Sequence, residues 1–308
     1  MSETPDKPDT PAPSQPPAEP TPQTSGTTGR IGVDSWVAES DARRARTPKA
    51  LVGFGWERTP DAVKLFLFVA FASSVPFWTN EADLYIFGLF TLLYAALGLG
   101  LNVVVGFAGL LDLGYVAFYG MGAYTYALLS SPHYGIHWPA EVTIPIAMAV
   151  PALVGVCLGF ASRRLLGDYL AIVTLFLGQA FLFFTQVTNP HDFTGGANGL
   201  PLVDPITFFG YQITSTKQQY FFLLIVVTLL AALTYFANQS RTGRAWRATR
   251  DDPLAAEAMS IPVNRVRILA FVMSAAIAGL CGAIYAAIQT AAVASNFNVS
   301  FLLSLIHI

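Results

Sequence analysis

The feature that most constrains this chain is a series of long apolar runs that starts near residue 62 and continues almost to the end. A helix needs about 20 mainly apolar residues to cross about 30 Å of hydrocarbon. Seven runs meet or approach this length: 62–79, 84–101, 103–130, 141–162, 169–188, 219–237 and 268–290. The sequence therefore predicts an all-α, polytopic helical membrane protein with about seven transmembrane helices.

The composition agrees with this fold class. Of the 308 residues, 54 % are hydrophobic and only 12 % are charged, against about 25 % charged in a typical soluble domain. So few charges cannot coat a soluble particle of this size, which argues against a water-soluble enzyme. Cys157 and Cys281 lie inside apolar runs without metal-ligand spacing, so we expect both to be packing residues.

The polar ends of the chain differ from its apolar middle. Residues 1–45 are rich in proline and threonine, and we expect a disordered tail because such a composition buries too little surface to offset its conformational entropy. No apolar stretch follows the charged start, so we expect no signal peptide. Residues 46–61 form a juxtamembrane segment, 62–300 form the membrane domain, and we treat 301–308 as a separate C-terminal end.

The basic residues predict the orientation of the chain. With the N-terminus in the cytoplasm and seven alternating spans, the cytoplasmic side receives the tail, the 163–164 turn and the loop 238–267. Sixteen of the 17 Lys and Arg residues then lie inside, and only Lys217 lies outside. We therefore expect an N-terminus in the cytoplasm.

Candidate chemistry within the apolar runs is sparse. Region 84–130 holds one ionisable carboxylate, Asp112, and many glycines, which favour close helix packing or a broken helix. Because an ionisable group at membrane depth is costly unless it has a function, we interpret Asp112, Gly114 and Tyr115 as a candidate substrate path. The alternative is a carboxylate bonded to helix termini or to a neighbouring subunit. No nucleophile with a base and no metal-ligand pair stands out, so we expect neither catalysis nor a cofactor.

The loop 238–267 is the most informative polar segment. Ser240 can cap a first helix, on which Arg244, Arg247 and Arg250 share one face because of their three-residue spacing. Asp252 followed by Pro253 predicts the start of a second short helix. Such helices dock into a groove on a partner or lie on the lipid surface, and the residues alone leave both readings open.

Four stretches together resemble a known family. They are GLGLNVVVGFAGLLDLGYVAFYGMGAYTYALL (98–129), LLGDYLAIVTLFLG (165–178), TGGANGL (194–200) and the long stretch 240–286, which opens with SRTGRAWRATRDDPLAAEAMSIPVNRVRILAF. In this combination and order the chain resembles the permeases of branched-chain amino-acid ABC importers, in particular the larger, LivM-type subunit. The likeness runs from about residue 84 to residue 300.

The resemblance implies an ATPase-docking role for the cytoplasmic loop. Arg247 lies on the same predicted helix face as Arg244. The residues that match the family's docking pattern are Gly243, Arg244, Ala245, Ala255, Ala256, Glu257 and Ala258. The family has a glycine after its Ala-Ala-Glu-Ala stretch, where this chain has Ser260.

The resemblance also implies the partners and the location. It implies a multi-pass protein of the inner membrane that carries leucine, isoleucine or valine with a second homologous permease subunit, two cytoplasmic ATPase subunits and a periplasmic substrate-binding protein. ATP would bind to the partner ATPases, and nucleic acid has no role. A urea or short-amide importer is the nearest alternative, and a secondary carrier or a membrane scaffold is more distant, since no convincing internal repeat is present. Family members continue beyond about residue 300, so we expect this chain to be truncated there.

Overall fold

The computed structural model describes residues 61–131, 135–162, 167–187, 194–208 and 210–298. These belong to one compact unit that begins at Asp61. The expectations for the tail 1–45, for most of the segment 46–61 and for the end 301–308 lie outside the described residues.

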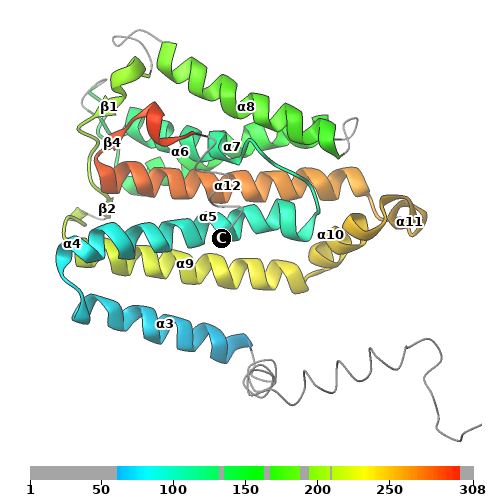
Figure 1. Cartoon of the computed structure of the whole chain (residues 1–308), viewed down its shortest axis with the longest axis horizontal. Helices are drawn as coiled ribbons and strands as arrows, with labels where there is room; N and C mark the ends of the chain where they lie inside the picture. The colour runs from blue at the N-terminus through cyan, green and yellow to red at the C-terminus, as the bar shows by residue number, and fades with distance from the viewer. Residues whose placement is uncertain (1–60, 132–134, 163–166, 188–193, 209, 299–308) are drawn as a thin grey trace, which may run out of the picture. The chain divides into compact units, whose positions relative to one another are not determined.

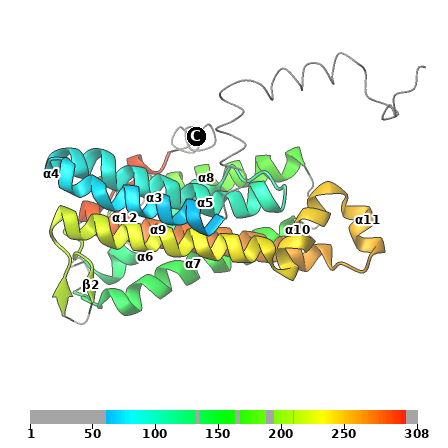
Figure 2. The same cartoon turned by 90° about the horizontal axis from the view of Figure 1, so that it is seen from below.

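Long helices lie side by side between two ends of this unit (Figure 1). In chain order the long helices are α3 (Asp61–Trp78), a continuous helix over Glu81–Phe107, α6 (Tyr115–Leu129), α7 (Ala140–Ala161), α8 (Asp168–Val187), α9 (Thr216–Gln239) and α12 (Val263–Gln289). Two short helices, α10 (Arg241–Asp251) and α11 (Pro253–Ala258), project at one end. Figure 2 shows the same pair beyond the end of α9.

Short strands lie at the opposite end. Strand β1 (Leu200–Pro201) pairs antiparallel with β4 (Ala291–Ala292), and β2 (Thr207–Phe208) pairs with β3 (Tyr211–Gln212). Two short 3-10 turns, Gly196–Asn198 and Ala294–Asn296, complete this end. We call it the strand end.

The prediction of a helical membrane protein is confirmed. Within the described residues, five helices are long and apolar enough to cross a membrane: Glu81–Phe107, α7, α8, α9 and α12. Two more, α3 and α6, follow the predicted runs 62–79 and 103–130, but α6 has only 15 residues. The number of helices therefore agrees roughly with the seven expected.

The predicted division of region 84–130 into 84–101 and 103–130 is wrong. The helix continues from Glu81 to Phe107 through α4 (Glu81–Asp83), α5 (Phe90–Asn102) and two π-helical turns, Leu84–Leu89 and Val103–Phe107. The interruption comes later, at 108–114, where Gly109 has a φ of +68°. Because the whole region is apolar, hydropathy could not place this interruption. We call residues 108–114 the helix break.

Helix α12 lies at the centre of the helices. It packs along α6, α7 and α5. Contact is close because glycines face one another: a side chain at Gly122 would collide with the backbone of Gly279. The expectation that these glycines serve close packing is therefore supported by the geometry.

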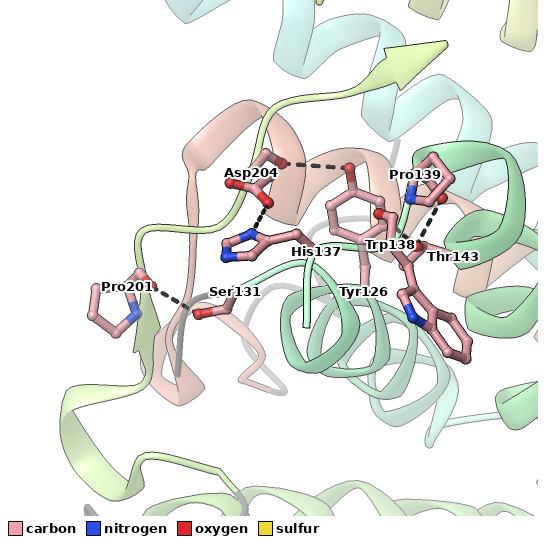
Figure 3. A network of polar contacts seen from close by, with 8 residues as sticks. All are labelled: Tyr126, Ser131, His137, Trp138, Pro139, Thr143, Pro201 and Asp204. Carbon is pink, nitrogen blue, oxygen red and sulfur yellow. Dashed lines mark hydrogen bonds and ion pairs between the residues drawn. The ribbon is translucent and has the colours of Figure 1, made fainter. Parts of the chain in front are cut away.

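Polar contacts fasten the connection between α6 and α7 at the strand end (Figure 3). His137 Nδ1 lies 2.6 Å from Asp204 Oδ2, and the Tyr126 hydroxyl donates to the Asp204 carbonyl over 3.4 Å. The Ser131 hydroxyl donates to the carbonyl of Pro201, the second residue of β1. The Thr143 hydroxyl, in the first turn of α7, donates to the Pro139 carbonyl. The Tyr126 and His137 contacts attach the end of α6 and the α6–α7 connection to the segment that follows β1, and the Thr143 bond closes the first turn of α7.

Candidate functional site

Helix α10 is anchored through one buried face. The Ser240 hydroxyl caps its first turn by accepting from the Gly243 N–H over 3.2 Å, as the sequence predicted. Trp246 is fully buried, and its indole N–H donates to the Val266 carbonyl of α12 over 2.8 Å. The Trp246 ring also stacks on Phe107, with centroids 6.3 Å apart. A buried tryptophan with a satisfied N–H therefore holds α10 against two other helices.

Two arginines of α10, Arg244 and Arg247, are exposed and reach the end of α9. Arg244 Nη1 donates to the Gln239 carbonyl over 2.9 Å, and Arg247 Nη1 donates to Asn238 Oδ1 over 3.1 Å. Both acceptors belong to the last turn of α9, where the helix dipole favours a cation. The two predicted docking arginines thus lie together, and one donor of each already fixes α10 to α9.

Helix α11 begins and ends as the sequence chemistry dictates. Asp252 Oδ1 accepts from the N–H groups of Leu254 and Ala255, and Pro253 occupies the first turn. At its C-terminus the Ile261 N–H donates to the Ala256 carbonyl over 3.0 Å. The Ser260 N–H donates to the Glu257 carbonyl over 2.9 Å, which completes a Schellman turn.

Ser260 therefore occupies the left-handed position of that turn, with a φ of +63°. Glycine is the usual residue there because it has no Cβ to clash with the following carbonyl. The departure from the family glycine, noted in the sequence, falls on the one residue of this turn that needs glycine most.

The predicted docking residues of α11 divide between two faces. Ala255, Glu257 and Ala258 are exposed, whereas Ala256 is buried against the chain's own body. Ala256 therefore does not share the exposed surface with the other alanines. Sequence reasoning missed two large apolar neighbours, Leu254 and Met259, which are 79 % and 77 % exposed.

A hollow lies beside this surface. It measures about 550 Å³ between the turn after α11, the first turns of α12 and the end of α7. Its lining includes Glu257, Ser260, Asn264 and Arg265. Exposed apolar side chains beside a hollow with charged walls are typical of a surface that binds another protein.

The predicted substrate-path residues come together in the helix break, but they are packed rather than open. The run 103–130 placed Asp112 inside a helical span. In the structure Asp112 lies instead in the non-helical connection between two helices. Its Oδ1 accepts from the Gly114 N–H over 3.0 Å, and its buried Oδ2 has no hydrogen-bond partner among the described residues.

The other two path residues fix the helix break to its neighbours. Gly114 lies so close to the Thr174 carbonyl of α8 that no side chain fits between them. The Tyr115 hydroxyl donates to the Leu97 carbonyl over 3.0 Å. The geometry therefore supports the alternative in which these residues hold helix ends together.

A separate cavity of about 540 Å³ opens between α6, α7 and α8. Its lining is almost wholly apolar, with Met121, Tyr124, Val150 and Phe181 among the side chains. A zwitterionic amino acid would lose the hydration of its charges there without gaining ionic partners. The cavity therefore fits an apolar group.

Comparison with known proteins places the chain in a family. The family model described as branched-chain amino acid transport system / permease component matches residues 84–308. The high-affinity branched-chain amino acid transport system permease proteins LivM of Escherichia coli (strain K12) and Salmonella typhimurium (strain LT2) are each 37 % identical over 252 residues.

Each of these matches covers 73 % of this chain and 58 % of the relative, so the chain spans less than two thirds of their length. No solved structure matches. The family model and both relatives agree with the helical membrane fold described above, and the chain belongs to the family of branched-chain amino acid transport system permease components.

Proposed function

We propose that this chain is a permease subunit of an ATP-driven importer that moves leucine, isoleucine or valine across the inner membrane. The observation that carries the proposal is the unit formed by α10 and α11, which is packed against the chain on one face and exposed on the other. In such a unit, a movement of a partner bound to the exposed face is transmitted to the membrane helices, because the buried face is packed against them. The names of both relatives supply the substrate class.

The end that carries α10 and α11 faces the cytoplasm in this proposal. Its support is the distribution of basic residues, since Arg241, Arg244, Arg247, Arg250 and the arginines of the first turns of α12 lie at this end. Among the described Lys and Arg residues, Lys217 alone lies at the strand end. Basic residues concentrate on the cytoplasmic side of membrane proteins, and α3 then begins on that side.

The proposal includes three kinds of partner. Two cytoplasmic ATPase subunits bind ATP and receive the surface formed by Leu254, Ala255, Glu257, Ala258 and Met259. A second permease subunit completes the path, and a periplasmic binding protein delivers the amino acid to the strand end. This subunit itself needs no cofactor in the proposal, because its role is to form and gate the path.

Charge reversal on α11 tests the docking surface. Glu257→Lys should lower the affinity for the ATPase subunits, measured by co-purification, by a factor of about thirty to several thousand. Breaking a buried charge contact costs about 2–5 kcal/mol, which corresponds to this range. Glu81→Lys makes the same change at an exposed residue of the strand end and should leave ATPase binding unchanged. If Glu257→Lys retains ATPase binding and uptake, the docking assignment fails; a lipid-bound helix would instead gain attraction from the added lysine.

Two further measurements test the orientation and the substrate. In a chain with Cys157→Ser, an impermeant maleimide applied from outside should label Thr214→Cys and spare Arg241→Cys; both positions are exposed. Proteoliposomes that hold the complete complex should accumulate labelled leucine, isoleucine or valine. Uptake of urea in their place would assign the chain to the alternative importer.

A further inference from the structure

Helix α10 touches the helix break through a side chain that the docking surface does not use. Arg250, near the C-terminus of α10, donates from Nη1 to the Gly106 carbonyl. The stem of the same side chain covers Gly109, where an added Cβ would meet Arg250 Cγ and Cβ. One arginine therefore contacts the chain both just before and just inside the helix break.

The turn that receives Arg250 has an unusual backbone. Residues Val103–Phe107 form a π-helical turn, in which the Ala108 N–H donates to the Val103 carbonyl over 3.3 Å. The Leu110 N–H then donates to the Val104 carbonyl over 3.0 Å. Such wide turns are rare and are frequent at functional sites. A change from π to α register there would shift every following residue of the helix break.

The far side of the helix break is attached to α8. The Leu113 N–H donates to Thr174 Oγ1 over 3.0 Å, and Gly114 packs against the Thr174 carbonyl. Between the two attachments, Leu111 is 49 % exposed. The segment that holds Asp112 is thus fixed by Arg250 at one end and by Thr174 at the other.

Trp246 gives α10 a fixed point about which Arg250 can move. Trp246 is bonded to α12 and stacked on Phe107, one turn of helix before Arg250. A tilt of α10 about this ring moves Arg250 relative to Gly106 while the centre of α10 stays in place. The contact that changes most is the hydrogen bond to the π-helical turn.

We propose that Arg250 is a positioning residue that couples α10 to the helix break, so that a tilt of α10 changes the conformation of residues 108–114. This inference rests on the proposed function, because the tilt comes from ATPase subunits bound to the docking surface of α11, which follows α10 directly in the chain. In this inference the π-helical turn has two conformations, with π or with α register. The contacts of Arg250 and the conformation of the helix break both favour one of them over the other. Arg250 itself need not touch an ATPase or the transported amino acid.

The test compares Arg250→Ala, Arg250→Lys and Arg241→Ala in the reconstituted complex. Arg241 is exposed in the first turn of α10, so its removal is a matched loss of one cation. Arg250→Ala should retain the ATPase subunits and basal ATP hydrolysis but lose about tenfold or more of the substrate-stimulated hydrolysis, the usual size of one charged hydrogen bond or one coupling term. Arg250→Lys should restore part of the loss, and Arg241→Ala should match the parent chain.

A conformational readout separates coupling from a merely structural role. In the Cys157→Ser chain, the maleimide labelling rate of Leu111→Cys should change when a non-hydrolysable ATP analogue is added to the complex. The same change should be absent with Arg250→Ala. A double-mutant cycle between Gly109→Ala and Arg250→Ala should be strongly non-additive in stimulated hydrolysis, because both act on one contact.

Three outcomes would overturn the inference: loss of the ATPase subunits in Arg250→Ala, an additive cycle with Gly109→Ala, or a nucleotide response at Leu111→Cys that survives without Arg250. The first would place Arg250 in the docking surface. Failure of the proposed function has a different signature, since the parent chain would then bind no ATPase and Glu257→Lys would have no effect.

Discussion

Helices α12 and α8 have nearly the same hydropathy, yet the fold uses them in opposite ways. In the most apolar window of α12, 67 % of residues are buried within the chain, against 28 % for α8. Helix α12 packs along α5, α6 and α7, whereas α8 packs mainly on α6. Hydropathy therefore identifies helices that can enter the membrane without deciding which of them lies at the centre.

The two helices differ in the size of their side chains. Helix α12 is rich in alanine and glycine, and Gly279 and Gly282 let the backbones of α7 and α6 approach directly. Helix α8 presents Phe176, Phe183 and Phe184 outward. Lipid tails are as apolar as leucine, so helix association depends on close van der Waals contact, which small residues permit.

The largest expected difference between the helices comes from removing one phenyl ring from each. Phe271 of α12 is fully buried, and Phe176 of α8 is 69 % exposed. Phe271→Ala should lower the free energy of unfolding by about 3–5 kcal/mol because it leaves a cavity, whereas Phe176→Ala should change it by less than about 0.5 kcal/mol. Thermal unfolding in one detergent measures both, and equal losses would show that α12 is not the more tightly packed helix.

Adding a methyl group should give the next largest difference. A Cβ at Gly282 would collide with the Tyr119 carbonyl, whereas a Cβ at Gly178 of α8 would meet nothing closer than 3.8 Å. Gly282→Ala should destabilise the chain by about 1–3 kcal/mol through overpacking. Gly178→Ala should gain up to about 1 kcal/mol from helix propensity. A stable Gly282→Ala chain in the same unfolding assay would contradict the close approach of α12 to α6.

A single hydroxyl on α8 should matter more than its small size suggests. Thr174 Oγ1 accepts from the Leu113 N–H of the helix break, whereas the Thr228 hydroxyl of α9 bonds only within its own helix in the described contacts. Thr174→Val should cost about 1–3 kcal/mol, because a partly buried N–H loses its acceptor. Thr228→Val is the control and should cost less. Equal losses of unfolding free energy in the two variants would contradict the attachment of α8 to the helix break.

The smallest expected effect concerns how each helix starts. A left-handed residue precedes both, Gly167 before α8 with φ +60° and Ser260 before α12 with φ +63°. Ser260→Gly should stabilise the chain by about 1 kcal/mol, because glycine relieves the Cβ strain. Gly167→Ser should cost a similar amount, and Ser260→Ala should gain nothing. A chain destabilised by Ser260→Gly would show that the serine side chain has a contact that outweighs its strain.

The sequence by itself determined the features that depend on a few adjacent residues or on summed hydropathy. Apolar runs of about 20 residues fixed the helical membrane fold, since unpaired backbone groups are too costly in hydrocarbon for another structure. Ser240, Asp252 and Pro253 fixed the starts of α10 and α11 through local capping bonds. The family likewise followed from the combination and order of four local stretches.

Only the tertiary structure decided which of these segments meet. The helix break falls at 108–114 because Arg250, Thr174 and Gly109 satisfy and shape its backbone, and two of these three are distant in sequence. Ala256 turns inward and Asp112 is packed rather than open for the same reason, namely contacts with other helices. The central place of α12 likewise depends on matching small residues across three helices, and no single segment contains that information.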